Sequence, residues 1–191
     1  MAILSASVSR GVVAAKKIFP CIRLAILLLL TVGWQNLHAQ TASKEYQVKA
    51  AFLYNFSQFV EWPPDAFPQA QSPLVIGILG DDPFGGSLDQ IVSGEKVNGH
   101  PLVIQHYHSV GEIKACHILF ISQSEGKESK AVLSALKGRD ILTVSDLDDF
   151  TKDGGIIRFV TENNKIRFKI NGEAAKAANL TLSSKLLRAA E

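Results

Sequence analysis

Apolar residues at helical spacing mark the most strongly patterned segment of the chain. They recur at steps of four, four, three and one, which is the spacing of one face of an α-helix, at Val48, Phe52, Phe56, Phe59 and Val60. Burying each Phe is worth very roughly 1.5–3 kcal/mol, so we expect this face to anchor a core. Proline lacks an amide donor and disfavours helical geometry in its predecessor, so Pro63 and Pro64 should end the helix. Lys49, Asn55 and Trp62 fit the core face poorly.

Short strand patterns alternate with helical patterns along the rest of the chain. Apolar runs, and one alternating stretch at 102–107, predict strands over residues 74–80, 102–107, 117–122 and 141–145. Helical spacing predicts helices through residues 88–92 and over 126–137, and Gly138 is placed to end the second. This alternation indicates a single three-layer α/β domain, in which a mostly parallel sheet carries helices on both faces.

Polar side chains that favour helix starts stand before several further segments. The expected caps are Asp82 before Pro83, Asp148 together with Ser145, Asn171 for a helix over 173–178, and Ser183 or Ser184 for a last short helix. Ser109–Glu112 has the spacing of a capping box, which predicts one more short helix.

A C-terminal antiparallel hairpin is predicted over residues 155–171. A two-residue turn at Asn163 and Asn164 pairs Ile157 with Ile170, Phe159 with Phe168, and Thr161 with Ile166 on one face. The opposite face then collects four cations: Arg158, Lys165, Arg167 and Lys169. A slip of one residue would bury these charges, so the register is strongly specified. An ordinary solvated face explains the cations, and an acidic protein surface or anionic lipid headgroups would also match them.

Residues 1–39 are expected to be a secretory signal peptide. Four basic residues and no acidic one precede an apolar run of eleven residues, Leu24 to Trp34. That length lies within the ~7–15 residues of a signal sequence and below the ~20 needed to span a bilayer. Leu37-His38-Ala39 offers a cleavage site, which leaves residues 40–191 as an exported domain. The alternative is a short uncleaved anchor.

Removing residues 1–39 changes the charge balance. Four of the 20 basic residues and none of the 18 acidic ones lie in that segment, so the mature chain has 16 against 18 and a net charge of −2. This balance does not favour nucleic acid as a partner. A mature chain of about 150 residues is one ordinary domain. Cys116 is the one cysteine of residues 40–191, so an intrachain disulfide is excluded there.

Ligands of parallel α/β sheets lie beyond the carboxyl ends of the strands. The small polar residues at those ends form our candidate ligand crevice: Asp81, Asp82, Ser122, Ser124 and Ser145. They contain no recognisable catalytic set. The loop over 80–86 lacks a Gly-Lys-Ser/Thr ending, and its two aspartates would repel phosphate, so nucleotide binding is not expected there.

Other groupings of reactive residues predict no catalytic or metal site. Adjacent residues on a strand face opposite ways, so Cys116 and His117 could not act on one another, and Cys116 is expected to be a buried structural thiol. The histidines between residues 100 and 108 are too few for a zinc site. The acidic run over 146–153 misplaces the glycine of a calcium loop. We therefore predict a protein that is not an enzyme and carries no metal or cofactor.

Several short segments together carry a family resemblance. In chain order they are Lys49-Ala-Ala-Phe-Leu-Tyr-Asn-Phe56, Phe59-Val-Glu-Trp-Pro63, Gly80-Asp-Asp-Pro-Phe-Gly85, Cys116-His-Ile-Leu-Phe-Ile121, Leu142-Thr-Val-Ser-Asp146, Gly154-Gly155, Ile170-Asn171 and Leu186-Leu187. Their number and order resemble the YfiR family of small periplasmic proteins, some of which restrain a membrane-bound diguanylate cyclase. Some family members are cross-linked internally, and this chain departs from them.

The resemblance implies a non-enzymatic regulator that binds the periplasmic sensor region of an inner-membrane diguanylate cyclase and lowers cyclic di-GMP. From the residues alone, the candidate partner-binding side chains are Trp62, Phe67, Arg158, Lys165, Arg167 and Lys169, because Trp and Arg are common interface anchors. The alternative is a periplasmic small-molecule-binding protein or hydrolase that uses the strand-end crevice. A homodimer is left open, and no stable membrane anchor is expected after cleavage.

Overall fold

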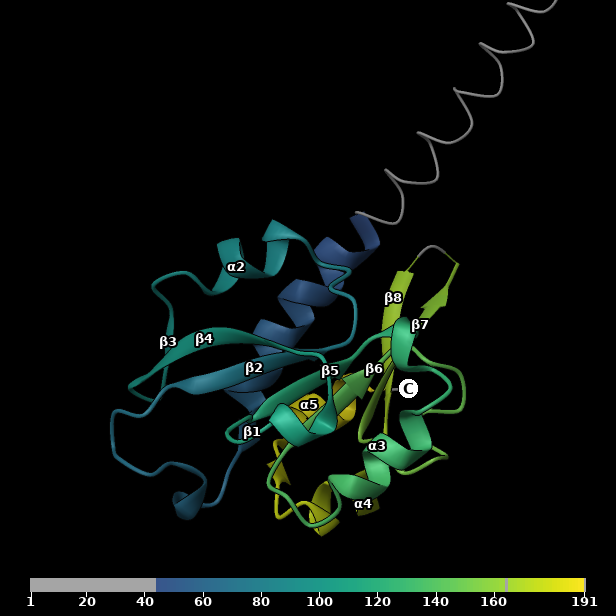
Figure 1. The fold of residues 1–191 in the computed structure, drawn as a ribbon. Coiled ribbons are helices and arrows are strands. Elements are labelled where there is room, and N and C mark those ends of the chain that lie inside the picture. The colour runs from purple at the N-terminus through teal and green to yellow at the C-terminus, as the bar shows by residue number, and fades with distance from the viewer. Residues whose placement is uncertain (1–43, 164, 191) are drawn as a thin grey trace, which may run out of the picture. The chain divides into compact units, whose positions relative to one another are not determined.

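The computed structural model describes residues 44–163 and 165–190, and these form one α/β unit (Figure 1). Its main sheet has seven strands in the order β3-β4-β2-β5-β6-β7-β8. Neighbours from β4 to β7 are parallel, and the two outer pairs, β3 with β4 and β7 with β8, are antiparallel. The strands are β2 (Leu74–Leu79), β3 (Lys96–Val97), β4 (His100–Tyr107), β5 (Ile118–Ile121), β6 (Leu142–Ser145), β7 (Ile157–Glu162) and β8 (Lys165–Ile170). The predicted mostly parallel sheet with a C-terminal hairpin is confirmed.

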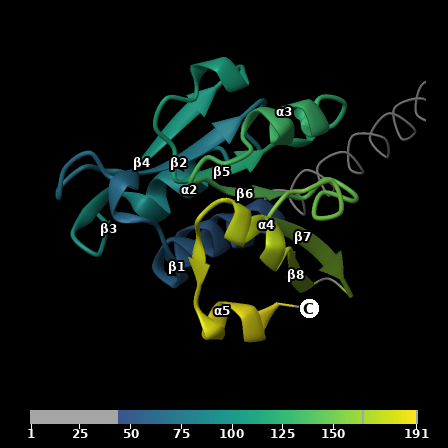
Figure 2. The ribbon, with the colours of Figure 1, turned by 90° about the horizontal axis from the view of Figure 1, so that it is seen from below.

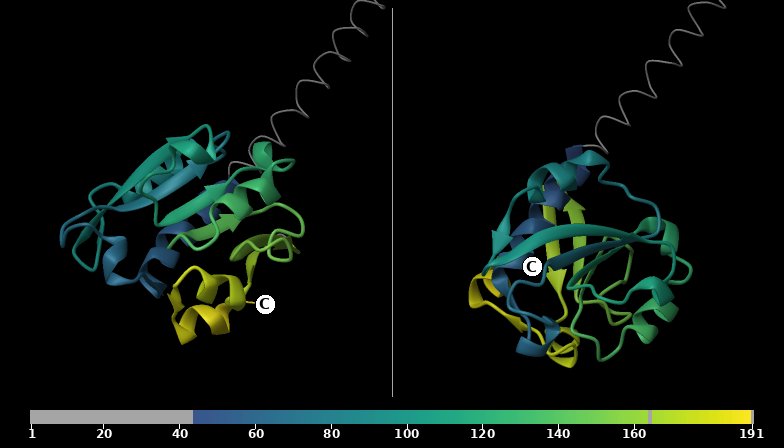
Figure 3. Two further views of the ribbon diagram at one scale, coloured as in Figure 1. Left: turned by 60° about the horizontal axis from the view of Figure 1, so that its bottom comes forward. Right: turned by 60° about the vertical axis from the view of Figure 1, so that its left-hand side comes forward.

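Helices cover both faces of this twisted, curled sheet, as the views in Figures 2 and 3 show. They are the helix over residues 44–59, α2 (Gly86–Val92), α3 (Ser129–Ala135), α4 (Gly172–Ala177) and α5 (Ser184–Ala189). Alternate β5 residues enter two different cores: Ile118 and Phe120 pack toward the helix over residues 44–59, whereas Leu119 and Ile121 pack with α3. Every residue of β2, β5 and β6 is buried, as expected for strands covered on both faces.

The helix over residues 44–59 ends earlier than the prolines predicted. Val60 and Glu61 form a short strand, β1 (Val60–Glu61), which pairs antiparallel with β9 (Thr181–Leu182). The amide of Ser183 also donates to the carbonyl of Phe59, at 2.9 Å. Pairing with a distant segment therefore ends the helix, and Val60 is buried from a strand rather than from the helix face.

The buried face of this helix is rotated by one position from the predicted stripe. Val48 is 45% exposed, whereas its neighbour Lys49 is 2% exposed. The face that enters the core is Lys49, Ala50, Leu53, Phe56 and Ser57, with Phe52 and Phe59 partly buried beside it. The placement of Val48 in the core was wrong because a buried lysine occupies that side of the helix. Asn55 is exposed.

The hairpin register is confirmed pair by pair. Ile157 faces Ile170, Phe159 faces Phe168, and Thr161 faces Ile166. The turn begins at Asn163, whose φ of 51° lies in the left-handed region that asparagine tolerates. The outer face carries the predicted cations, of which Lys165, Arg167 and Lys169 are exposed.

The predicted helix caps were right in two places and wrong in three. The Asn171 side chain accepts from the Ala174 amide, and the Ser183 hydroxyl accepts from the Leu186 amide, so both cap helices. Asp82 instead accepts from the Phe84 amide two residues on, an Asx turn that leaves α2 to begin after Gly85.

The Ser109 side chain makes no capping bond, and residues 110–112 form only a 3₁₀ turn. Residues 148–154 form turns, so Ser145 and Asp148 do not cap the short helix that was predicted there. The expected helix over 126–137 is shortened to α3, and Gly138 follows it at a φ of 77°.

Candidate functional site

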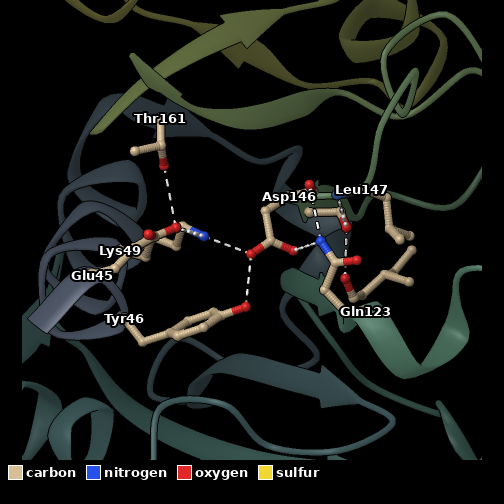
Figure 4. A network of polar contacts seen from close by, with 9 residues as sticks. Glu45, Tyr46, Lys49, Gln123, Asp146, Leu147 and Thr161 are labelled. Carbon is tan, nitrogen blue, oxygen red and sulfur yellow. Dashed lines mark hydrogen bonds and ion pairs between the residues drawn. The ribbon is translucent and has the colours of Figure 1, made fainter. Parts of the chain in front are cut away.

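The main polar cluster lies where the helix over residues 44–59 meets the carboxyl ends of two parallel strands. Gln123 follows β5 and Asp146 follows β6, so both leave the sheet at the same edge. The helix contributes Glu45, Tyr46 and Lys49, whose positions i, i+1 and i+4 turn them toward that edge. Figure 4 shows Tyr46, Lys49 and Gln123 converging on the Asp146 carboxylate, while Glu45 reaches the cluster through Lys49.

A buried ion pair is the centre of the cluster. The Lys49 ammonium lies 2.5 Å from Asp146 Oδ2 and 2.6 Å from Glu45 Oε1. The Asp146 side chain is 8% exposed, so the charges of Lys49 and Asp146 are both largely removed from water. Breaking such a pair by removing one partner is strongly destabilising, because the other charge is left buried. The pair therefore fixes the helix to the end of β6.

Further donors satisfy the remaining lone pairs of Asp146. The Tyr46 hydroxyl donates to Oδ2 at 2.8 Å, and the Gln123 amide donates to Oδ1 at 2.8 Å and to the Asp146 carbonyl at 3.1 Å. Burial, and then the hydrogen bond to Asp146, raise the pKa of Tyr46, so this phenol stays a donor. Because Asp146 is bonded from three sides, it is suited to holding structure rather than to proton transfer.

A cavity of about 500 Å³ opens beside this cluster, between the helix and the hairpin. Its lining carries charges of both signs: Glu45, Tyr46, Lys49, Gln123, Asp146, Asp148, Arg158, Phe159, Val160, Thr161, Glu162 and Lys169. Arg158 donates to Asp148, while its buried Nε has no hydrogen-bond partner among residues 44–163 and 165–190. Such a lining can bind a small polar molecule.

The predicted crevice residues lie at the expected edge but mostly face other groups. The Asp81 amide donates to the Ser124 hydroxyl at 2.9 Å. The Ser145 hydroxyl is buried and donates to the Ile121 carbonyl at 2.7 Å, and Ser122 is also buried. Asp82 lies 3.2 Å from His106 Nε2. The cavity is instead lined by Gln123 and Asp146, which are the immediate neighbours of the predicted serines in the sequence. That the predicted residues bind a ligand stays a prediction.

The structure separates the predicted partner-binding residues into two surfaces. Trp62 and Phe67 lie near the amino-terminal ends of β2 and β5, where Phe67 stacks between His100 and His117. Arg158, Lys165, Arg167 and Lys169 lie on the hairpin at one edge of the sheet. Arg158 is half-buried, whereas the other three are exposed.

Cys116 is a buried thiol, as predicted. Its Sγ donates to the Ile118 carbonyl at 3.1 Å, and burial raises its pKa to about 12. A thiol that remains protonated is a poor nucleophile. No group of three or more His, Cys, Asp or Glu side chains suited to a metal ion occurs in the part of the chain that the structure describes.

Sequence reasoning missed the helix side of the site. Glu45, Tyr46 and Lys49 were not candidate site residues, although a lysine among the apolar positions of a helix was the one available signal. Its partner Asp146 is 97 residues away in the chain. The Glu45–Lys49 pair has helical i, i+4 spacing, but local spacing does not show that such a pair is buried.

Two comparisons with known proteins bear on this fold and site. A family model described as YfiR/HmsC-like matches residues 46–191. No curated protein matches the chain. Among residues 44–163 and 165–190, no helix is long and apolar enough to cross a membrane.

Proposed function

Because the chain belongs to the YfiR/HmsC-like family, we propose that it is a non-enzymatic periplasmic regulator that binds and restrains an inner-membrane diguanylate cyclase. Restraint of the cyclase lowers cyclic di-GMP. The observation that carries this proposal is the match of one family model to residues 46–191, which includes almost every described element. The predicted signal peptide at residues 1–39 lies outside the described residues, and it supplies the export that a periplasmic role requires.

The physical requirement on such a regulator is modest. A protein restrains an enzyme when it binds the inactive state more tightly than the active one. It needs a stable surface and no catalytic group of its own. The internally paired Lys49–Asp146 cluster and the protonated thiol of Cys116 support a binding role over a catalytic one.

The hairpin is our proposed contact surface for the cyclase. Lys165 and Lys169 extend from exposed positions on the outer face of β8, the last strand of the seven-stranded sheet. Cations on a sheet edge suit an acidic partner surface and steer association at low ionic strength.

We expect the double variant Lys165→Glu/Lys169→Glu to bind the periplasmic region of the cyclase about tenfold more weakly at low salt, because two rim contacts become repulsive. Titration calorimetry at two salt concentrations measures the loss. Lys127→Glu/Lys137→Glu is the matched control, since it makes the same charge change at exposed positions around α3. Equal weakening by both double variants would show that net charge, rather than the hairpin, governs binding.

The function itself is tested by deleting the gene and measuring cellular cyclic di-GMP. We expect a rise that the exported protein reverses when it is supplied in trans. Co-purification with the protein then identifies the cyclase, and its periplasmic region is the probe for the hairpin variants. Unchanged cyclic di-GMP under conditions where the protein is abundant would contradict a cyclase repressor. That result would favour the second candidate, small-molecule binding in the cavity beside Asp146.

A further inference from the structure

Two histidines hold the segment over residues 64–73 against the sheet. Phe67 projects from this segment between the His100 and His117 rings, with centroids 3.9 Å and 4.4 Å away and ring planes within 18°. His100 begins β4, and His117 directly precedes β5. The Trp62 indole, just before the segment, donates to the His117 carbonyl at 3.2 Å.

Backbone groups determine which nitrogen of each ring carries the proton. The Val75 amide donates to His117 Nδ1 at 3.0 Å, and His117 Nε2 lies 3.2 Å from the Ala66 carbonyl. A carbonyl only accepts, so Nε2 carries the hydrogen and Nδ1 is the acceptor of a neutral ring. His100 Nδ1 lies 2.7 Å from the Ser72 carbonyl and must therefore donate.

The two rings differ in their response to a second proton. His100 can be protonated at its other nitrogen while it continues to donate to Ser72. His117 cannot, because a proton on Nδ1 would point at the Val75 amide hydrogen and replace a hydrogen bond with a clash of two donors. The same ring bonds Ala66 and stacks on Phe67, so its displacement removes these contacts and leaves the segment held by His100 alone of the two rings.

We propose that His117 is an acid-sensitive latch, whose protonation releases residues 64–73 from the ends of β2 and β5 and exposes Phe67 and Trp62. Space for this movement exists on both sides of the segment. A cavity of about 570 Å³ lies along Trp62 and Phe67, and another of about 400 Å³ lies along Ala66 and His117. Pro68 lines both. The latch does not depend on the identity of the partner.

The surroundings of His117 shift its pKa and thereby define the pH range of the latch. Burial lowers its pKa below the ordinary value of 6.5, the Ala66 hydrogen bond opposes this, and His100 on the far side of Phe67 adds to the lowering. Lys114, Arg139 and Asp140 line the same cavity as His117. Arg139 donates to the carbonyls of Ile113 and Lys114, and Asp140 accepts from Asn179. Asp65 lies within the released segment, at an exposed position.

The sign of the effect follows from linkage. In the open state, His117 has an ordinary pKa near 6.5, whereas in the closed state its pKa is lower. The open state therefore binds more protons just below pH 6.5. Its population should rise about tenfold for each pH unit until the closed-state pKa is reached. Above pH 6.5 the segment should stay closed.

Hydrogen exchange of the Val75 amide tests the latch, because this hydrogen is bonded to Nδ1 only while the latch is closed. We expect its protection factor, corrected for intrinsic exchange, to fall about tenfold per pH unit below pH 6.5. The Phe120 amide in the centre of β5 should show no such fall. In the chain carrying Trp34→Phe, Trp62 is the single indole, and acrylamide should quench its fluorescence more strongly over the same range.

Two variants identify the responsible ring. His117→Asn has no titratable ring, so the protection of Val75 should no longer depend on pH. His106→Asn changes an exposed histidine and should leave the dependence intact. Far-UV circular dichroism checks that each variant is folded. The latch would be refuted by Val75 protection that is constant from pH 8 to pH 5, by a parallel loss at Phe120, or by a dependence that survives in His117→Asn.

Discussion

We expect Lys49→Met to lower the free energy of unfolding by about 3–5 kcal/mol, the typical cost of removing one partner from a buried ion pair. Methionine matches the unbranched lysine side chain as far as Cε and lacks only the ammonium group, so most of the loss comes from the charge rather than from an empty volume. The Asp146 carboxylate would keep its bonds from Tyr46 and Gln123 but would lose its cation. Urea denaturation followed by circular dichroism measures the change.

Two further variants separate this effect from a general cost of losing a lysine. Lys152→Met removes a cation from the exposed pair with Asp149, and it should change stability far less than Lys49→Met because water screens both charges. Lys49→Met/Asp146→Asn removes both charges of the buried pair and should cost less than the sum of its single variants. A loss in Lys49→Met no larger than that in Lys152→Met would show that the buried charges are not coupled.

Phe56→Ala should cost about 3–5 kcal/mol, because it empties the centre of an aromatic cluster. Phe56 is 1% exposed, stacks on Phe159 at 5.8 Å and meets Phe168 edge-on at 5.2 Å. Phe52 lies 6.0 Å away on the preceding helical turn. The loss would therefore weaken the packing of the helix over residues 44–59 on the hairpin, where the contacts of Phe52 with Phe159 and Phe168 would remain. Thermal and urea unfolding both report it.

Val48→Ala is the matched control on the same helix. The apolar spacing places Val48 in the core, but the structure leaves it 45% exposed, so its truncation should change stability by less than about 0.5 kcal/mol. A cost for Val48→Ala that approaches that for Phe56→Ala would mean that Val48 is buried in the folded protein.

The contrast between the helix and the hairpin shows what local pattern can predict. In the hairpin, a one-residue slip would bury Lys165, Arg167 and Lys169 together. The cost of burying these charges disfavours the slipped pairing and leaves one register. In the helix, the apolar stripe can rotate by one position at little cost. What selects the observed rotation is the pairing of Lys49 with Asp146, and no local rule indicates a partner 97 residues away.

At the strand ends, the cavity is lined by Gln123 and Asp146 rather than by the serines next to them in the sequence, and this offset has a physical cause. Parallel strands bring their carboxyl ends to one edge, so the edge itself could be inferred. Successive residues of a strand, however, point in opposite directions. A strand that is covered on both faces shows no alternation of polar and apolar residues, so its sequence does not indicate which side chains at its end face the cavity. Ser145 therefore faces the interior, whereas Asp146 faces the cavity. The cap predicted at Asp82 failed for a local reason. An aspartate can accept a hydrogen bond from a backbone amide near it in the sequence instead of capping a helix, and Asp82 accepts from the Phe84 amide.

The helix over residues 44–59 connects opposite ends of the sheet. Near its start, Lys49 is fixed to the carboxyl end of β6, and beyond its last turn the chain enters β1 and then the segment that packs on His117 near the amino end of β5. Its sixteen residues extend about 24 Å as a continuous α-helix, which resists stretching along its axis. A shift of one end along the helix axis would therefore move the other end, so the polar cluster at Asp146 and the segment that packs on His117 are joined through a single rigid element.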